Sequence, residues 1–189
     1  ADSGNNADAG SRPSFNECAA STTEARLTPA NLLFLVDRSG SMNCVPPDGD
    51  AAEAQLCLTD PRRRGDGDSK WEVTRAALSS ALGELSNREN VSAGLSLFPL
   101  PESKCDVEAT PSVDVVALDA VQLELMDQVL LAVSPDGDTP LAGGSILSYA
   151  HLATALKERK LEGNTFLVLF TDGSETCKRE ELQKLVDRD

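Results

Sequence analysis

Two largely apolar segments, each ending in an oxygen-rich turn, constrain the fold of this chain more than any other feature. Residues Asn31–Val36 stop at Asp37, and Asn164–Phe170 stop at Thr171 and Asp172. A short, continuous apolar run is typical of a strand covered on both faces, as in parallel sheets. We therefore expect two central strands of an α/β sheet. Ligands of such sheets gather beyond the carboxyl ends of the strands, where these two turns lie.

The rest of the chain alternates between helical and strand patterns. A helix is predicted from Ser69 to about Asn87, because Ser69 and Glu72 form a capping-box pattern. Its predicted buried face consists of Trp71, Ala77, Leu78, Ala81, Leu82 and Leu85. Further strands are predicted at Val91–Phe98 and Val113–Leu118, and further helices at Leu118–Val133, Gly143–Lys160 and about Lys178–Val186. The alternation predicts an α/β fold with a doubly wound, mostly parallel sheet and helices on both faces.

The chain length indicates one folded unit with a loose end. A chain of 189 residues with 40% hydrophobic residues can build one buried core. Residues 1–25 are predicted to be a flexible tether, since residues 1–12 are too polar to offset the entropy of ordering. Residues 26–189 form the predicted domain, with an insertion at about 43–68 rich in Pro, Gly and Asp. A tether of this kind can follow an export signal or a lipid anchor upstream, although a cytosolic protein can also begin with a disordered tail.

The acidic composition narrows the classes of partner. The net charge of −14 opposes binding to nucleic acid and to anionic membrane surfaces. Divalent cations and cationic surfaces are better candidates, although acidity also serves solubility alone. No segment approaches the roughly 20 apolar residues that a transmembrane helix needs.

The cysteines favour disulfides over a zinc site. The five cysteines contain no C-x-x-C pair and are Cys18, Cys44, Cys57, Cys105 and Cys177. Cys44 and Cys57 bracket the insertion, and a disulfide between them would close it. One cysteine is left without a partner within the chain, and buried free thiols remain the alternative. Disulfides support an extracellular, cell-surface or periplasmic location.

Oxygen side chains follow both central strands at positions suited to a hard metal ion. Asp37, Ser39 and Ser41 occupy alternate positions of one turn. Mg²⁺ takes about six oxygen ligands, so further donors are required, and Thr139 and Asp172 lie in loops expected at the same edge of the sheet. Each residue alone is more typical of a helix cap or a turn than of a metal site. The five together predict a metal site.

Three segments resemble the metal-ion-dependent adhesion site of von Willebrand factor A domains of the bacterial secreted or lipoprotein type. They are Asp37–Met42 after an apolar strand, Asp138–Gly144 before a helix, and Phe170–Gly173 after another strand. The resemblance covers residues 31–189 approximately and implies a Rossmann-like fold. It also implies an adhesion and protein-binding function without catalysis.

The resemblance assigns a role to each candidate residue. It implies that Ser39 and Ser41 bind the metal directly, and that Thr139 binds it directly or through water. Asp37 and Asp172 would act mainly through water and hydrogen bonds. The implied metal is Mg²⁺, or alternatively Mn²⁺ or Ca²⁺. Its open coordination position would accept a Glu or Asp carboxylate from a protein or a surface polymer.

The sequence also departs from the family. The insertion at 43–68 is longer than the usual link to the first helix, and we expect it to form a disulfide-clamped flap near the metal edge. The family sheet gains further strands after the segment equivalent to Phe166–Phe170. We therefore expect either a truncated chain or an abbreviated sheet with an exposed edge.

Three other readings compete with the adhesion module. A phosphohydrolase of the haloacid dehalogenase type would use Asp37 as nucleophile, but Ser39 stands where that family places its general acid. A Ser-His-Asp hydrolase has little support, since His151 is the only histidine and no G-x-S-x-G is present. The third is a von Willebrand factor A scaffold whose metal is purely structural, or a subunit of a metal-chelatase-like assembly.

Overall fold

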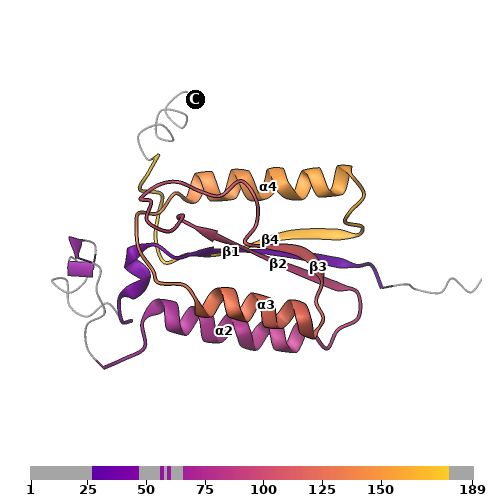
Figure 1. Ribbon diagram of the computed structural model, residues 1–189, viewed down its shortest axis with the longest axis horizontal. Helices are drawn as coiled ribbons and strands as arrows, with labels where there is room; N and C mark the ends of the chain where they lie inside the picture. The colour runs from indigo at the N-terminus through magenta and orange to yellow at the C-terminus, as the bar shows by residue number, and fades with distance from the viewer. Residues whose placement is uncertain (1–26, 47–55, 58, 61–65, 179–189) are drawn as a thin grey trace, which may run out of the picture.

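The computed structural model describes residues 27–46, 56–57, 59–60 and 66–178 of the chain. The helices and strands with described bounds, labelled as in Figure 1, are β1 Ala30–Asp37, η1 Gly40–Asn43, α2 Lys70–Leu85, β2 Val91–Phe98, β3 Val113–Ala117, α3 Ala120–Leu131, α4 Leu141–Lys157 and β4 Asn164–Phe170. These confirm the strands and helices predicted between residues 31 and 170. The helix predicted at about Lys178–Val186 and the tether at 1–25 lie outside the described residues.

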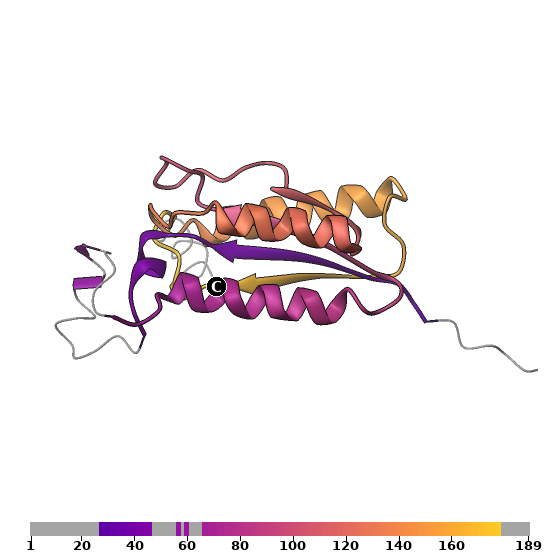
Figure 2. The same ribbon diagram turned by 60° about the horizontal axis from the view of Figure 1, so that its bottom comes forward.

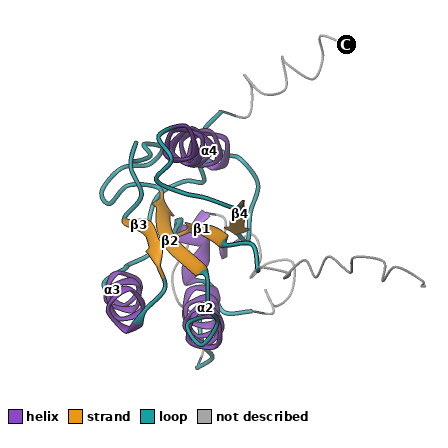
Figure 3. Cartoon of the chain, turned by 90° about the vertical axis from the view of Figure 1, so that its right-hand side faces the viewer, coloured by secondary structure: helices purple, strands orange, loops and turns teal. Residues whose placement is uncertain are grey.

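The strands form one sheet in the order β3-β2-β1-β4. Strand β1 pairs in parallel with both β2 and β4, and β3 runs antiparallel to β2 at the edge. Helices α2 and α3 cover one face of the sheet and α4 covers the other (Figure 3). The predicted doubly wound, mostly parallel α/β fold is confirmed.

Strand β1 is covered on both faces, which explains its continuous apolar sequence. Phe34 and Val36 join the core beneath α2 and α3, together with Leu82 of α2 and Met126 of α3. Leu33 faces the other way and packs in the cluster that α4 completes with Leu152 and Ala155. The strand is thereby held rigidly, and its carboxyl end carries the first candidate loop.

Helix α2 begins at the predicted cap. The Ser69 hydroxyl accepts from the Glu72 backbone N–H, and the Glu72 carboxylate accepts from the Ser69 backbone N–H. Trp71, Leu78 and Leu82 are buried, as predicted. The prediction was wrong for two alanines of the same helix, Ala77 and Ala81, which are exposed. Each follows the apolar spacing, but a helix turns by about 100° per residue, so these two lie one step around the helix from Leu78 and Leu82.

Helix α4 differs from its prediction at both ends. It begins at Leu141, two residues before the predicted Gly143, because a distant glutamate satisfies its first turn, as described below. It ends at Lys157 rather than Lys160, and Arg159 then adopts a left-handed conformation with φ of 57°. The earlier start depends on a residue far away in the sequence, so a local sequence pattern could not predict it.

Strand β4 forms one edge of the sheet within the described part of the chain. Phe166 and Leu169 project from its two faces and remain 50% and 42% exposed. A central strand of this composition would bury both. Within the described residues, β4 is therefore an edge strand whose side chains are only partly covered.

Candidate metal centre

Three loops meet at the carboxyl ends of β1 and β4. Both strands point toward the same end of the sheet (Figure 2), so the residues that follow them are neighbours in space. The first loop follows β1, the second precedes α4, and the third follows β4. The sequence placed one part of the candidate site in each of these loops.

Asp37 lies at the bottom of the site and is fully buried. Its Oδ1 accepts a 2.7 Å hydrogen bond from the Ser39 backbone N–H, and its Oδ2 accepts a 2.6 Å hydrogen bond from the Thr171 hydroxyl. Burial raises the pKa of Asp37; hydrogen bonds from Thr171 and Ser39 act against this effect, and nearby Asp172 reinforces it. Asp37 therefore fixes the first and third loops to each other, and its charge is costly in this position.

The two serine hydroxyls of the first loop lie within hydrogen-bonding distance of each other. Ser39 Oγ is 3.2 Å from Ser41 Oγ, and the Ser41 hydroxyl donates a 2.9 Å hydrogen bond to Asp172 Oδ1. Ser39 is buried and Ser41 is half-buried. Residues 131 positions apart in the sequence thus share one oxygen cluster.

Thr139, in the second loop, lies next to the turn that holds Asp172. Its backbone N–H donates to Thr176 Oγ1 at 2.8 Å, and its carbonyl accepts from the Thr176 backbone N–H at 3.0 Å. A Cβ placed on Gly173 would lie 3.8 Å from Thr139 Oγ1, so this hydroxyl borders the turn that holds Asp172. All five predicted residues are therefore brought to one edge of the sheet.

Backbone hydrogen bonds hold the first two loops together. The Gly40 N–H donates to the Gly137 carbonyl, and the Asp136 N–H donates to the Arg38 carbonyl, both at 2.9 Å. The buried Arg38 guanidinium also donates to the Ser134 carbonyl at 2.7 Å. The site is consequently preorganised by contacts that its own side chains do not make.

Glu175 is a structural residue of the site that sequence reasoning missed. Its Oε2 accepts a 2.6 Å hydrogen bond from the Ala142 backbone N–H in the first turn of α4. Its Oε1 accepts from the backbone N–H groups of Cys177 and Lys178, both at 2.7 Å. Pro140 stands at the N-cap of α4 and supplies no side-chain cap, so the helix start lacks a local acceptor. That missing cap was the one available signal.

Two disulfides flank the oxygen cluster. Cys44 pairs with Cys57, which confirms the predicted closure of the insertion. Cys105 pairs with Cys177 and links the loop after β2 to the segment after β4. The fifth cysteine, Cys18, and most of the predicted flap lie outside the described residues.

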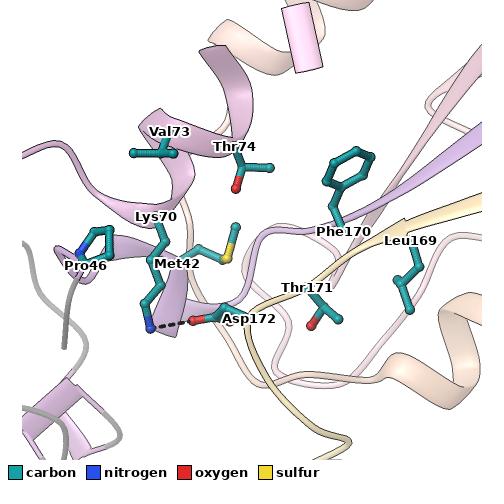
Figure 4. Close-up of a pocket in the computed structure, with 9 residues that line it drawn as sticks. All are labelled: Met42, Pro46, Lys70, Val73, Thr74, Leu169, Phe170, Thr171 and Asp172. Carbon is teal, nitrogen blue, oxygen red and sulfur yellow. Dashed lines mark hydrogen bonds and ion pairs between the residues drawn. The ribbon is translucent and has the colours of Figure 1, made fainter. Parts of the chain in front are cut away.

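Lys70 brings a positive charge to the same edge, which sequence reasoning also missed. Its Nζ lies 3.0 Å from Asp172 Oδ2 (Figure 4). Beside this ion pair is a pocket of about 340 Å³. The lining residues are Met42, Pro46, Lys70, Val73, Thr74, Leu169, Phe170, Thr171 and Asp172.

The fold has counterparts among pilus proteins. The PilB minor pilin from Streptococcus sanguinis superposes with a TM-score of 0.52 and 16% identity, covering 80% of this chain and 31% of that one. The pilus adhesin SpaC from Lactobacillus rhamnosus GG, in its open conformation, gives a TM-score of 0.54 and 18% identity, covering 80% and 16%. The von Willebrand factor domain of the type V pili tip protein Mfa5 from Porphyromonas gingivalis gives a TM-score of 0.46 and 17% identity, covering 80% and 40%.

The likeness to PilB and SpaC is one of fold. No family model and no curated protein matches the sequence. The chain spans less than a third of the length of either structure. In the described part of the chain, no helix has the length and apolarity that a membrane crossing requires.

Proposed function

We propose that this chain is an extracellular adhesion module that captures an acidic group of its partner through a divalent cation. One observation carries the proposal: hydroxyl and carboxylate oxygens from separate loops converge at one sheet edge, with Ser39 Oγ 3.2 Å from Ser41 Oγ and Ser41 Oγ 2.9 Å from Asp172. Such clusters are costly unless they bind something, because polar groups and negative charge are concentrated in a partly desolvated place.

The donor set fits a small hard cation. It consists of the hydroxyls of Ser39, Ser41 and Thr139 and the carboxylates of Asp37 and Asp172, all oxygen atoms, as Mg²⁺ and Mn²⁺ prefer. The charge at Asp37, which burial makes costly, gives an independent reason for a cation here.

The chain's own residues divide the work of binding. Ser39 and Ser41 would donate hydroxyl oxygens, and Thr139 would do so directly or through water. Asp37 would hold Ser39 in place through the backbone N–H contact, and Asp172 would orient Ser41. When bound, a cation with mostly neutral ligands keeps enough positive charge to attract a carboxylate from a partner.

The fold, the disulfides and the net charge favour adhesion at a cell surface. SpaC is a pilus adhesin and PilB a minor pilin, and their shared fold makes a surface role the natural proposal for this chain. The two disulfides support an oxidising compartment. The net charge of −14 keeps nucleic acid an unsuitable partner, so we propose a protein or surface polymer that presents Glu or Asp side chains.

We propose binding without turnover. The phosphohydrolase alternative requires Asp37 to attack a substrate, but Asp37 is fully buried and both of its oxygens accept hydrogen bonds. A nucleophile needs one exposed oxygen. This arrangement supports a carboxylate that positions other groups.

Calorimetric titration with Mg²⁺ and Mn²⁺ tests the proposal. We expect wild type to bind, and Ser39→Ala and Asp172→Ala each to weaken binding by at least about tenfold. Ser80→Ala and Asp114→Ala, at exposed positions on α2 and β3, serve as matched controls. Equal affinity of all five proteins, or no binding by wild type, would remove the site. Partner capture from a bacterial surface with and without chelator then separates adhesion from a structural ion.

A further inference from the structure

Lys70, the first residue of α2, shares the carboxylate of Asp172 with the hydroxyl cluster. Its ammonium lies 3.0 Å from Asp172 Oδ2, while Asp172 Oδ1 accepts the hydrogen bond from Ser41. The Lys70 and Asp172 side chains are only 17% and 12% exposed. One oxygen of the Asp172 carboxylate therefore faces the Lys70 ammonium (Figure 4), and the other faces Ser41, a proposed metal ligand.

The backbone of Lys70 is held close to the site. The Ser69 capping box fixes the first turn of α2, and the Lys70 backbone N–H donates a 2.8 Å hydrogen bond to the Cys44 carbonyl. The disulfide to Cys57 restrains Cys44 in turn. The Lys70 side chain can change its rotamer, but the backbone of Lys70 is held in place.

A divalent cation and an ammonium group oppose each other at this distance. Both would be attracted to Asp172, and they repel each other because they carry like charge. We propose that Lys70 determines the affinity and ligand specificity of the cation site by competing with the metal for Asp172. This inference rests on the proposed function. In the metal-bound protein, the released ammonium becomes available to an anionic ligand.

The neighbouring pocket suits that second role. Lys70 lines the 340 Å³ pocket whose remaining wall is mainly apolar, including Met42, Val73 and Phe170. An acidic ligand at the cluster would therefore meet a positive charge at the mouth of an apolar recess. Removing Lys70 should have opposite effects: tighter metal binding and weaker binding of a carboxylate to the metal-loaded protein. A residue with a merely structural role would not produce this pair of changes.

The first test is Mg²⁺ calorimetry on wild type, Lys70→Met, Lys70→Arg and Lys157→Met. Lys157 is exposed in the last turn of α4, so its substitution changes the net charge equally without touching the site. We expect Lys70→Met to bind Mg²⁺ about fivefold more tightly, since a partly exposed ion pair and a like-charge repulsion are modest effects. Lys70→Arg and Lys157→Met should match wild type. Thermal unfolding of each variant without metal confirms that it is folded.

The second test uses acetate as the probe, titrated into the Mg²⁺-loaded proteins and followed by NMR. We expect acetate to bind Lys70→Met about threefold more weakly than wild type. Equal or weaker Mg²⁺ binding by Lys70→Met than by a binding-competent wild type would overturn the inference and leave the proposed function intact. Equal acetate affinity would overturn the ligand role, and absence of Mg²⁺ binding in every protein would overturn both proposals.

Discussion

The hydroxyl of Thr171 donates a 2.6 Å hydrogen bond to the carboxylate of Asp37, although the two residues are 134 positions apart in the sequence. The contact joins the residue that ends β1 to the residue that follows β4. It fixes the first and third loops of the site relative to each other. Because Asp37 is fully buried, this donor also stabilises a charge that has no access to bulk water.

Thr171→Val should test this contact directly. The substitution keeps the shape but removes a donor from a buried carboxylate, so the free energy of unfolding should fall by about 1–3 kcal/mol. Denaturant unfolding measures the change. Thr154→Val is the matched control. Thr154 is exposed on α4, and its hydroxyl donates to the Ala150 carbonyl of the same helix. Equal effects of the two substitutions would contradict the importance of the Thr171 contact.

Asp37→Asn should stabilise the metal-free protein while weakening Mg²⁺ binding. Removing a buried charge should raise the free energy of unfolding at neutral pH by about 1 kcal/mol. Substitutions that remove a group kept for function at a cost in stability commonly have effects of this size. Calorimetry with Mg²⁺ should show the accompanying loss of affinity. A variant that loses stability without metal would show that the carboxylate serves the fold rather than a ligand.

The pH dependence of stability should reveal the same group. The pKa of Asp37 is raised above its ordinary value of 3.8, chiefly by burial. The folded state therefore holds a proton that the unfolded state has lost, and stability falls as pH rises from 3.8 through the raised pKa. Other carboxylates of the protein also titrate in this pH range. The quantity to measure is therefore the difference in unfolding free energy between wild type and Asp37→Asn. A difference that does not change with pH would contradict the raised pKa.

The two disulfides should differ in their effect on the site. Replacing both Cys105 and Cys177 with Ser opens a connection across 72 positions, which corresponds to about 4 kcal/mol in the chain-entropy model, against about 3 kcal/mol for the 13 positions between Cys44 and Cys57. The Cys105–Cys177 bond also anchors the loop that holds Asp172, so Mg²⁺ affinity should fall when this bond is removed. Chemical denaturation and calorimetry on the two double variants measure both effects. Unchanged affinity without the Cys105–Cys177 bond would contradict this anchoring role.

Two glycine-to-alanine substitutions should change stability in opposite directions. Gly163 has φ of 91°, and a Cβ there would lie against the Pro29 carbonyl oxygen, so Gly163→Ala should destabilise by more than about 1 kcal/mol. Gly83 lies inside α2 with open space around it, so Gly83→Ala should stabilise by about 0.5–1 kcal/mol. Thermal unfolding of both variants in one buffer gives the comparison. A stabilising Gly163→Ala would mean that the turn before β4 is not tightly held.

Much of the fold follows from local patterns. The apolar run at β1 predicted a strand covered on both faces, and Ser69 with Glu72 predicted the start of α2. Parallel pairing of β1 and β4 then places Asp37 and Asp172 at one edge, so the convergence of the loops could be inferred from topology. The resemblance to von Willebrand factor A domains supplied the expected order of the three segments.

The missed features are contacts between distant parts of the chain. Glu175 caps α4 from 33 positions away, and Lys70 meets Asp172 across 102 positions. Neither spacing has a periodicity that a sequence window can detect. Ala77 and Ala81 were misplaced because small apolar side chains are tolerated on either side of a helix.

The central position of β1 has a consequence for biosynthesis. One of its edges pairs with residues 91–98, but the other waits for residues 164–170, and the hydroxyl that meets Asp37 comes one residue later. A nascent chain that has emerged only as far as α4 therefore leaves one edge of this apolar strand unpaired, with a carboxylate at its end. Parallel pairing over such long separations forms slowly and leaves edges open to wrong partners. The same arrangement that assembles the oxygen cluster leaves the growing polypeptide with an open sheet edge until β4 is in place.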